Sequence, residues 1–344
     1  MNPGENKKRA ATFRNPEWIP VSFHINYSCW HHYDQKELKM LMADHKKLFP
    51  DYEYTDEEVK PNYAPWQKAG KPYTDPWGCV WETADDGITG AVVDHPIKTW
   101  DDFKGYKAPD PDKVRGWGNA VDWEQEKKNM QNRDLKAGGL RHGHTFLTLT
   151  YIRGYENLLF DMMDERPELR ELIQMVEDYN MAIVKHYLDC GIEWMGYAED
   201  LGMQVGPMIT PAMFEEFIKP SYTRIIAPAR EAGCIIHQHS DGDIRQLVGH
   251  LIEGGVEVIN LQDLVNGIDW IEENLKGTIA IDLDIDRQAI TRFGTPEEID
   301  SHIKNCVEKL NTPEGGLMMV HGMYPGIPIE NANALMDAFE KYCF

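Results

Sequence analysis

Two hydrophobic patterns divide the chain near residue 135. Residues 1–135 are rich in aromatic residues, proline and charge, with many turn signals but little long periodicity. From residue 136, short apolar runs that end in polar residues alternate with long amphipathic stretches. This predicts an irregular N-terminal elaboration over 1–135, packed on the main part of a regular α/β fold over 136–344, in one structural domain. The apolar runs are AGGLRHGH, IEWMGYAED, GCIIHQHSDG, VEVINLQD, TIAIDLD and GLMMVHGMYPG.

Helices with readable boundaries lie between these runs. Thr210-Pro211 is typical of an N-cap followed by a first-turn proline, and Thr-Pro-Glu-Glu at 295–298 matches a capping box. A third helix ends near Gly191. Strands that alternate with helices at this spacing indicate parallel βαβ units, in either a (β/α)8 barrel or a doubly wound sheet. Because no GxGxxG follows the first clear strand, the TIM barrel is favoured. The apolar stripe of the third helix comprises Leu169, Leu172, Ile173, Val176, Ile183 and Tyr187.

Composition excludes several classes of function. The 57 acidic against 35 basic residues give a net charge of −22, which repels nucleic acid and anionic membranes. The six cysteines form no CxxC pair, so neither a zinc knuckle nor a disulfide framework is expected. The N-terminus is polar, and no apolar run approaches the roughly eighteen residues of a membrane span. We therefore expect a cytoplasmic protein whose partners include neither nucleic acid nor a membrane.

Polar residues at the strand ends are the candidates for chemistry, because a TIM barrel gathers its catalytic groups at the C-terminal ends of its strands. His237, His239 and Asp241 share one face if their strand continues that far, whereas Gln238 points away. Two imidazoles and a carboxylate are plausible zinc ligands, but a hydrogen-bonded polar strand end is the alternative. The other strand-end candidates are His142, His144, Glu199, Asp200 and His321.

Each of these candidates also has a structural interpretation. Glu199 and Asp200 are adjacent, which usually places one carboxylate inward and the other toward solvent. His142 and His144 are either substrate contacts or part of the following loop. The N-terminal aromatic residues, Tyr27 and Trp30 among them, either bind a flat apolar substrate or form the core of the elaboration.

Five segments follow one another along the chain: EDLGMQVGPMITPAMF at 199–214, FIKP at 217–220, HSDGDI at 239–244, LIEGGVEVIN at 251–260 and PIEN at 328–331. In this order they resemble the uroporphyrinogen decarboxylase superfamily. This resemblance implies a TIM barrel. True uroporphyrinogen decarboxylases carry an N-terminal RQAGR-type motif that binds substrate carboxylates, and nothing like it occurs before residue 60. The chain is therefore more similar to the branch of cobalamin-dependent methyltransferases.

The resemblance also implies a modified metal site. Thiol-methylating members of the branch hold zinc with an HxC pair and a later cysteine. Those positions correspond here to His239-Ser240-Asp241 and to His321, so both thiolates are replaced. A shell of nitrogen and oxygen ligands leaves zinc a harder Lewis acid, which suits an ether or alcohol oxygen better than a thiol. The chain thus resembles methyltransferase I of the anaerobic aryl methyl ether O-demethylase systems, also in DPWGCVWE at 75–82 and RGYEN at 153–157.

The resemblance implies that zinc is bound by His239, His321 and a carboxylate from Asp200, Glu199 or Asp241. The methyl group of a methoxylated aromatic would pass to cob(I)alamin on a separate corrinoid protein, with Tyr27 and Trp30 stacking on the ring. His237 and Gln204 would orient ligands or substrate, and His142 and His144 would contact substrate.

Several alternatives stay open. Asp241 is a ligand, orients His239, or leaves a metal-free site in which His239 is a general acid. The other functions are a decarboxylase related to uroporphyrinogen decarboxylase, a corrinoid methyltransferase with another methyl donor, and a corrinoid-binding scaffold without catalysis.

Overall fold

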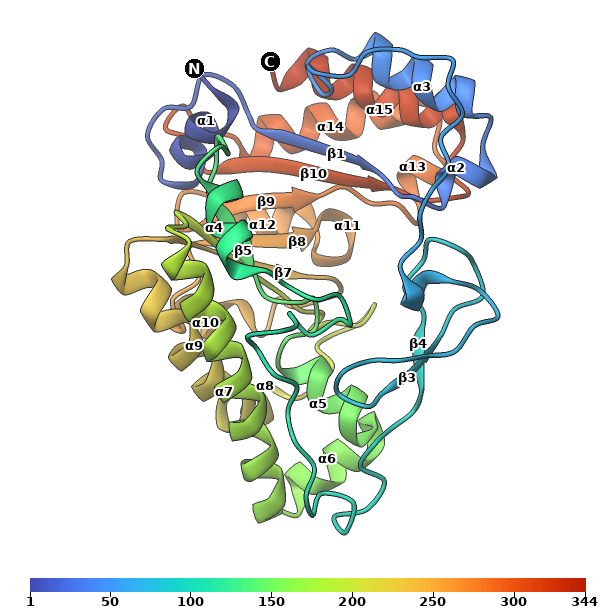
Figure 1. Ribbon diagram of the computed structural model, residues 1–344. Helices are drawn as coiled ribbons and strands as arrows, with labels where there is room; N and C mark the ends of the chain where they lie inside the picture. Colours follow the sequence, from blue (N-terminus) through green and yellow to red (C-terminus); the bar gives the residue numbers. More distant parts are fainter. The chain divides into compact units, whose positions relative to one another are not determined.

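A computed structural model describes all residues 1–344 (Figure 1). The contacts within the chain divide it into two compact units. Both units are discontinuous in sequence, because each takes segments from more than one part of the chain. Unit 1 comprises Met1–Lys71, Thr83–Thr89 and Gln262–Phe344, and unit 2 comprises Pro72–Glu82 and Gly90–Leu261.

Three parallel strands form the sheet of unit 1. The central strand, β10 (Leu317–Met323), pairs with β1 (Val21–Ile25) on one edge and with β9 (Ala280–Asp284) on the other. All five residues of β9 are buried, as expected for a parallel strand covered on both faces. β1 lies within the segment 1–135, so that segment supplies a strand of the parallel sheet as well as irregular structure.

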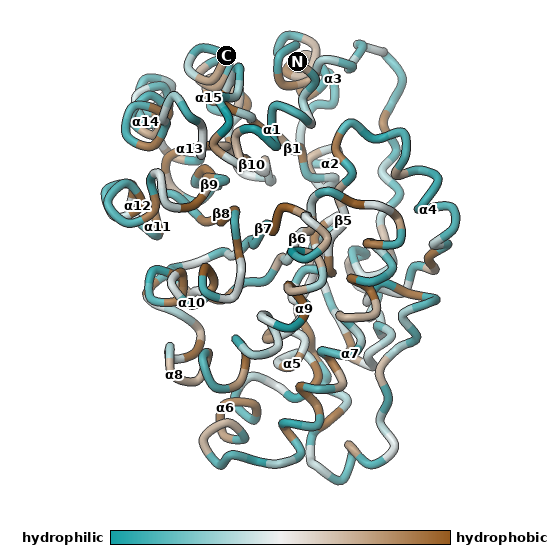
Figure 2. The backbone as a smooth tube through the Cα atoms, turned by 90° about the vertical axis from the view of Figure 1, so that its left-hand side faces the viewer, coloured by the Kyte–Doolittle hydropathy of each residue, from teal (hydrophilic) through white to brown (hydrophobic).

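Helices accompany this sheet, and α14 (Pro296–Leu310) packs against α15 (Ile329–Tyr342). The predicted capping box is confirmed, because Thr295 Oγ1 accepts from the Glu298 backbone N–H and the Glu298 carboxylate accepts from the Thr295 N–H. Figure 2 shows both hydrophilic and hydrophobic residues along α14, as expected for an amphipathic helix. The other helices of unit 1 are α1 (Pro3–Ala11), α2 (Cys29–His32), α3 (Gln35–Asp44), α11 (Asp263–Asn266), α12 (Ile268–Asn274), α13 (Ile290–Phe293) and the 3-10 turn η1 (Pro65–Gln67).

Unit 2 contains a second parallel set of strands. β5 (Ala137–Gly139) pairs with β6 (Trp194–Ala198), β6 pairs with β7 (Ile235–Ser240), and β7 pairs with β8 (Val258–Gln262), which ends at the unit boundary. Every apolar run of the sequence contains one of the parallel strands, so the predicted strands are confirmed.

A small antiparallel sheet also belongs to unit 2, with the order β2 (Tyr73–Thr74), β3 (Val80–Glu82) and β4 (Ala91–Asp94). The DPWGCVWE segment at 75–82 forms the turn between β2 and β3 and then β3 itself.

Two helices of unit 2 have boundaries that the sequence predicted. The apolar stripe that ends near Gly191 forms α7 (Pro167–Asp189), which packs against α9 (Lys219–Glu231). Thr210 is the N-cap of α8 (Pro211–Met213), because its hydroxyl accepts from the Met213 N–H. No helix in the structure has the length and apolar character that a membrane span requires. The remaining helices of unit 2 are α4 (Trp123–Met130), α5 (Phe146–Arg153), α6 (Tyr155–Met163), α10 (Val248–Glu253) and the π-helical turn η2 (Phe214–Ile218).

Candidate functional site

The C-terminal ends of β5, β6 and β7 bring polar side chains together in unit 2. Register explains the meeting: His239 lies opposite Ala198 on β6 and opposite Asn260 on β8. His142 comes three residues after β5, and Asp200 comes two residues after β6. Since parallel strands end at one edge of the sheet, these residues reach a common place.

His142, Asp200 and His239 form the centre of this cluster. Asp200 Oδ1 lies 3.1 Å from His142 Nε2 and 3.5 Å from His239 Nε2. Asp241 stands beside them, with Oδ1 3.8 Å from His239 Nε2, and its backbone N–H donates to Asp200 Oδ1 over 3.2 Å. All four side chains keep some solvent exposure, so a small molecule can approach the cluster.

The nearest residue on β8 fixes the orientation of His239. Asn260 Oδ1 forms a short hydrogen bond with His239 Nδ1. When an amide oxygen accepts from Nδ1–H, the lone pair of the imidazole stands on Nε2, which is the atom that faces Asp200 and Asp241. A hydrogen bond of this kind to the second ring nitrogen is also what orients a histidine that binds a metal ion.

The pKa values of Asp200 and His239 shift in opposite directions. Burial alone would raise the pKa of Asp200, but the hydrogen bonds from His142 and His239 hold the pKa of this carboxyl well below its usual range. Burial alone would lower the pKa of His239, yet Asp200 and Asp241 raise it to about 9. Without a metal, the cluster therefore contains an ionised carboxylate paired with an imidazolium.

The donor set fits a divalent metal ion. Zinc bonds of about 2.0–2.1 Å in tetrahedral geometry place neighbouring ligand atoms about 3.3 Å apart. The separations of 3.1, 3.5 and 3.8 Å around Asp200 and His239 are close to that value. The ligand atoms of His142, Asp200 and His239 all lie within 4.8 Å of one another. Two imidazoles and a carboxylate suit zinc and similar ions.

Glu199 points away from the cluster, as expected for one of two adjacent carboxylates. Its side chain is fully buried, and Oε1 accepts from the backbone N–H groups of Thr145 (2.9 Å) and Leu147 (2.8 Å) at the start of α5. Oε2 accepts a short hydrogen bond from the Tyr222 hydroxyl. Burial raises the pKa of Glu199 although these donors oppose the shift. The carboxylate thus holds the N-terminus of α5, and its predicted catalytic role stays a prediction.

The other candidates in unit 2 lie outside the cluster. His144 is buried between the rings of Tyr197 and Tyr222, and burial lowers its pKa to about 3. His237 packs against Trp194, with the ring centroids 5.4 Å apart. Gln204 is exposed on the loop after β6.

Three candidates belong to unit 1. His321 is fully buried on β10, where its Nδ1 lies 3.1 Å from the Ile285 carbonyl oxygen and its ring packs on Phe23. Burial lowers the pKa of His321 to about 4. Tyr27 is exposed and Trp30 is partly buried at the start of the chain. The ligand role of His321 and the substrate contacts of both aromatic residues stay predictions.

The sequence predicted a substrate contact for His142 and gave no role to Asn260 or Arg141. A polar residue within the buried strand VINLQ was the available signal for Asn260. The Arg141 side chain is 4% exposed and donates to Asp75 Oδ2 (3.2 Å) and to the Gly116 carbonyl oxygen (2.7 Å). Arg141 directly precedes His142, so this buried ion pair fixes the chain beside the cluster.

Comparison with known proteins agrees with this architecture. Residues 77–342 match the uroporphyrinogen decarboxylase (URO-D) family. The chain is 23% identical over 167 residues to a uroporphyrinogen decarboxylase of Prochlorococcus marinus strain NATL1A. It is 23% identical over 170 residues to that of Synechococcus sp. strain CC9605, and each match covers 45% of this chain. The chain spans about half the length of these curated relatives, 46% in each case.

A solved structure of a methyltransferase from Methanosarcina mazei is similar over 99% of both chains, with a TM-score of 0.70 and 14% identity. At this identity the similarity shows the fold, and it confirms the prediction of a TIM-barrel-like α/β fold.

Proposed function

Because the chain belongs to the uroporphyrinogen decarboxylase (URO-D) family, we propose that it is an enzyme of that family that cleaves a methyl ether, preferably a methoxylated aromatic. The methyl group would pass to cob(I)alamin on a separate corrinoid protein. The observation that carries this proposal is the cluster of His142, Asp200 and His239 at the strand ends of unit 2. A metal ion held by the nitrogen and oxygen atoms of this cluster would be a harder Lewis acid than one held by thiolates, and a harder Lewis acid suits an ether oxygen.

The difficulty of the reaction lies in the leaving group. The bond between the methyl carbon and the ether oxygen breaks, and its electron pair stays on the oxygen. The carbon gains a bond to cobalt, whose electron pair comes from the cob(I) state, and the phenolate takes up one proton. A site that stabilises the negative charge developing on the oxygen lowers this barrier.

We propose that His142, Asp200 and His239 hold a divalent ion, zinc in the first place, with Asp241 next to them. When bound, the ion would supply a Lewis acid to the ether oxygen. Asn260 would hold the His239 ring in place, and the Asp75–Arg141 ion pair would hold the chain next to His142. His321 stays a proposed additional ligand, and Tyr27 and Trp30 stay proposed contacts of the aromatic ring.

A decarboxylase is the second candidate, because the family match and the curated relatives carry that name. The lack of an RQAGR-type motif before residue 60 argues against a highly anionic porphyrinogen as substrate. A methyltransferase with a different methyl donor, such as an alcohol or an amine, would use the same cluster.

The test is spectroscopic. The chain is mixed anaerobically with a corrinoid carrier protein reduced to cob(I)alamin and with a panel of methoxylated aromatics, methanol and methylamines. We expect conversion to methylcob(III)alamin with a methoxylated aromatic, together with one phenol per methyl group transferred. His239→Ala should lower the rate by about 100- to 1,000-fold, as expected for loss of a group that stabilises developing charge.

The control variant is His186→Ala, which removes a histidine paired with Asp112 on the surface of unit 2. It should react like the unmodified chain. A chelator should abolish the reaction and Zn²⁺ should restore it, whereas activity that survives chelation would favour His239 as an acid. If no donor methylates a carrier that another methyltransferase does methylate, the proposal fails, and release of CO2 from uroporphyrinogen becomes the next measurement.

A further inference from the structure

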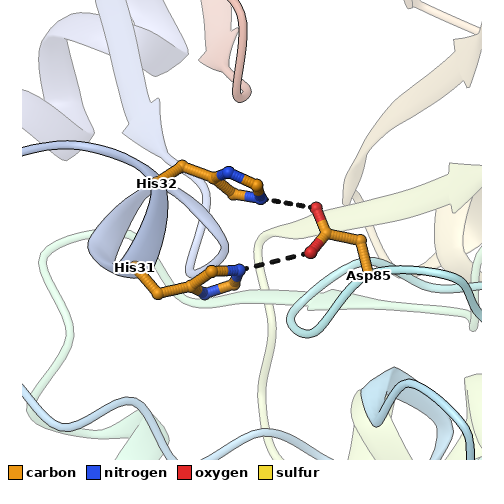
Figure 3. A group of neighbouring side chains, drawn as sticks. All are labelled: His31, His32 and Asp85. Atoms are coloured by element: carbon orange, nitrogen blue, oxygen red, sulfur yellow. Dashed lines mark hydrogen bonds and ion pairs between the residues drawn. The ribbon is translucent and has the colours of Figure 1, made fainter.

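A second cluster of metal-binding side chains lies in unit 1, within residues that the proposed function does not use. Figure 3 shows His31 and His32 of α2 directed at Asp85 of the segment 83–89. His31 Nε2 lies 3.2 Å from Asp85 Oδ1, and His32 Nε2 lies 2.7 Å from Asp85 Oδ2. The two imidazole centroids are 4.4 Å apart. Two rings thus share one carboxylate.

This arrangement is unusual for adjacent residues of a helix. Side chains at positions i and i+1 diverge by about 100° around the helix axis, so neighbouring rings do not normally face the same group. Here both Nε2 atoms face one carboxylate, and the ligand atoms of the three residues lie within 4.8 Å of one another. The three side chains are 36–39% exposed, so an ion can reach them from solvent.

The surrounding residues hold both halves of the cluster in place. His31 Nδ1 lies 2.6 Å from the Tyr63 hydroxyl, which fixes the ring on the side opposite Asp85. The Gly87 N–H donates to the Gln67 carbonyl oxygen over 2.9 Å. A Cβ atom at Gly87 would lie 2.7 Å from the Ser28 nitrogen, so the segment that carries Asp85 is pressed against the start of α2. Only glycine, with φ +88° and no side chain, permits this approach.

We propose that His31, His32 and Asp85 bind a divalent transition-metal ion of the class that accepts imidazole and carboxylate, such as Zn²⁺, Co²⁺ or Ni²⁺. The two nitrogen-to-oxygen distances, 3.2 and 2.7 Å, are both shorter than the roughly 3.3 Å expected between neighbouring ligands of a tetrahedral ion, so each ring would move away from the carboxylate by about 0.6 Å or less. The Tyr63 hydroxyl can accept a hydrogen bond as well as donate one. It therefore supports the tautomer in which His31 carries its proton on Nδ1 and offers the Nε2 lone pair to the ion.

Such an ion would tie together segments that have little regular structure. Between α3, which ends at Asp44, and the antiparallel sheet, the structure assigns only the three-residue turn η1. The ion would link α2 directly to Asp85, and through Tyr63 it would also order this long connection. Cross-links that close long flexible loops have the largest entropic effect on stability. The inferred site would therefore be a structural metal site that stabilises the fold, and it shares no residue with the candidate catalytic cluster in unit 2.

The experiment measures Co²⁺ binding to the full chain without a purification tag that binds metal. His142→Ala/His239→Ala serves as the background, because it removes the imidazole ligands of the other exposed cluster. In this background we expect one equivalent of Co²⁺ per chain by equilibrium dialysis, a visible absorption band of tetrahedral cobalt, and a higher thermal midpoint with Co²⁺ than without it.

Variants within the cluster identify the ligands. Asp85→Asn and His32→Ala should each abolish the bound equivalent and the rise in thermal midpoint, whereas Tyr63→Phe should weaken the affinity by about 10- to 100-fold. The matched control is His186→Ala, since His186 forms a single pair with Asp112 at 2.7 Å. It should bind as the background does. The thermal midpoint of each metal-free variant shows that it is folded.

Two results would overturn the proposal. One is the absence of stoichiometric Co²⁺ in the background variant. The other is binding that survives His32→Ala and disappears with His302→Ala, which would assign the ion to the buried group of Asp263, His302 and Cys306. The thiolate of Cys306 would then give the strong charge-transfer absorption of a cobalt–sulfur bond, which the His31–His32–Asp85 site lacks.

Discussion

Asp75→Asn tests whether a buried ion pair holds the antiparallel sheet of unit 2 on the strand that leads into the candidate site. Asp75 Oδ1 accepts from the N–H groups of Trp77 (2.9 Å) and Cys79 (3.0 Å). Oδ2 accepts from Trp81 Nε1 (3.0 Å) and Arg141 Nη1 (3.2 Å). The side chains of Asp75 and Arg141 are 0% and 4% exposed. Asparagine keeps one oxygen, but its amide nitrogen cannot accept from the two remaining donors.

The magnitude follows from this geometry. Removal of one partner of a buried ion pair costs about 3–5 kcal/mol, because the remaining charge stays buried without compensation. Arg141 keeps the Gly116 carbonyl oxygen and the face of the Trp117 ring, which lies 4.6 Å from its guanidinium carbon. These contacts keep the cost within that range. For a unit of about 150–250 residues, each kcal/mol lowers the thermal midpoint by about 2–4 °C, so we expect a fall of about 6–20 °C.

The assay is thermal unfolding followed by circular dichroism, with a double-mutant cycle. In an Arg141→Met background, Asp75→Asn should lower the thermal midpoint by less. The buried Arg141 charge, which Asp75→Asn would leave without its partner, is absent there. The control is Asp101→Asn, which removes an exposed ion pair with Lys104 and should change the midpoint by less than about 2 °C. A fall of less than 2 °C for Asp75→Asn, or equal effects in both backgrounds, would refute the reasoning.

Three further substitutions test unit 2. Burial alone would raise the pKa of Glu177, but hydrogen bonds from Arg224 and Ser221 lower the pKa below its ordinary value of 4.5. The ionised Glu177 therefore stabilises the fold above pH 4.5, and this stabilisation is lost as the pH falls through the folded-state pKa. The difference in thermal midpoint between the unmodified chain and Glu177→Gln should therefore be largest near pH 7 and shrink below pH 4, and a constant difference would contradict it. Gly202→Ala should cost about 1–3 kcal/mol in urea unfolding, because a Cβ there would lie 2.5 Å from the Asp243 nitrogen. Gly249→Ala should instead stabilise by about 0.5–1 kcal/mol, because its Cβ would meet nothing within 4 Å in α10, and equal effects would contradict this contrast.

The regular elements were predictable because their signals are local. Each apolar run from residue 136 onward contains a strand, and the capping residues at 210 and 295 begin helices. β1 was not predicted, since its five residues VSFHI look no different from other short alternating stretches of the N-terminal part. Its identity comes from pairing with β10, in the register Val21 opposite Met319. Pairing of this kind depends on residues distant in sequence, which a local pattern does not report.

The sequence predicted where the candidate site lies, but not which residues form it. The rule that polar residues gather at strand ends found His239, Asp200 and Asp241, which do lie together. It could not separate Glu199 from Asp200, because the direction of each carboxylate depends on the backbone N–H groups that α5 places beside Glu199. It also assigned His142 to substrate, since the distance of 3.1 Å between His142 and Asp200 arises only when β5 and β6 are paired.

The residues that support the site were the least predictable, for a physical reason. Asp75 and Arg141 are 66 residues apart, and each looks like a surface charge in its own sequence context. Both side chains matter for stability because they are buried. A buried charge without its partner is costly, so the fold favours the one arrangement that keeps Asp75 and Arg141 paired. The same burial joins the antiparallel sheet to the chain one residue before His142. A loss of that pair should therefore disturb the cluster as well as the stability of unit 2, although neither Asp75 nor Arg141 belongs to the cluster. The position of the candidate ligand His142 thus depends on an antiparallel sheet in the part of the chain for which the hydrophobic pattern predicts only irregular structure.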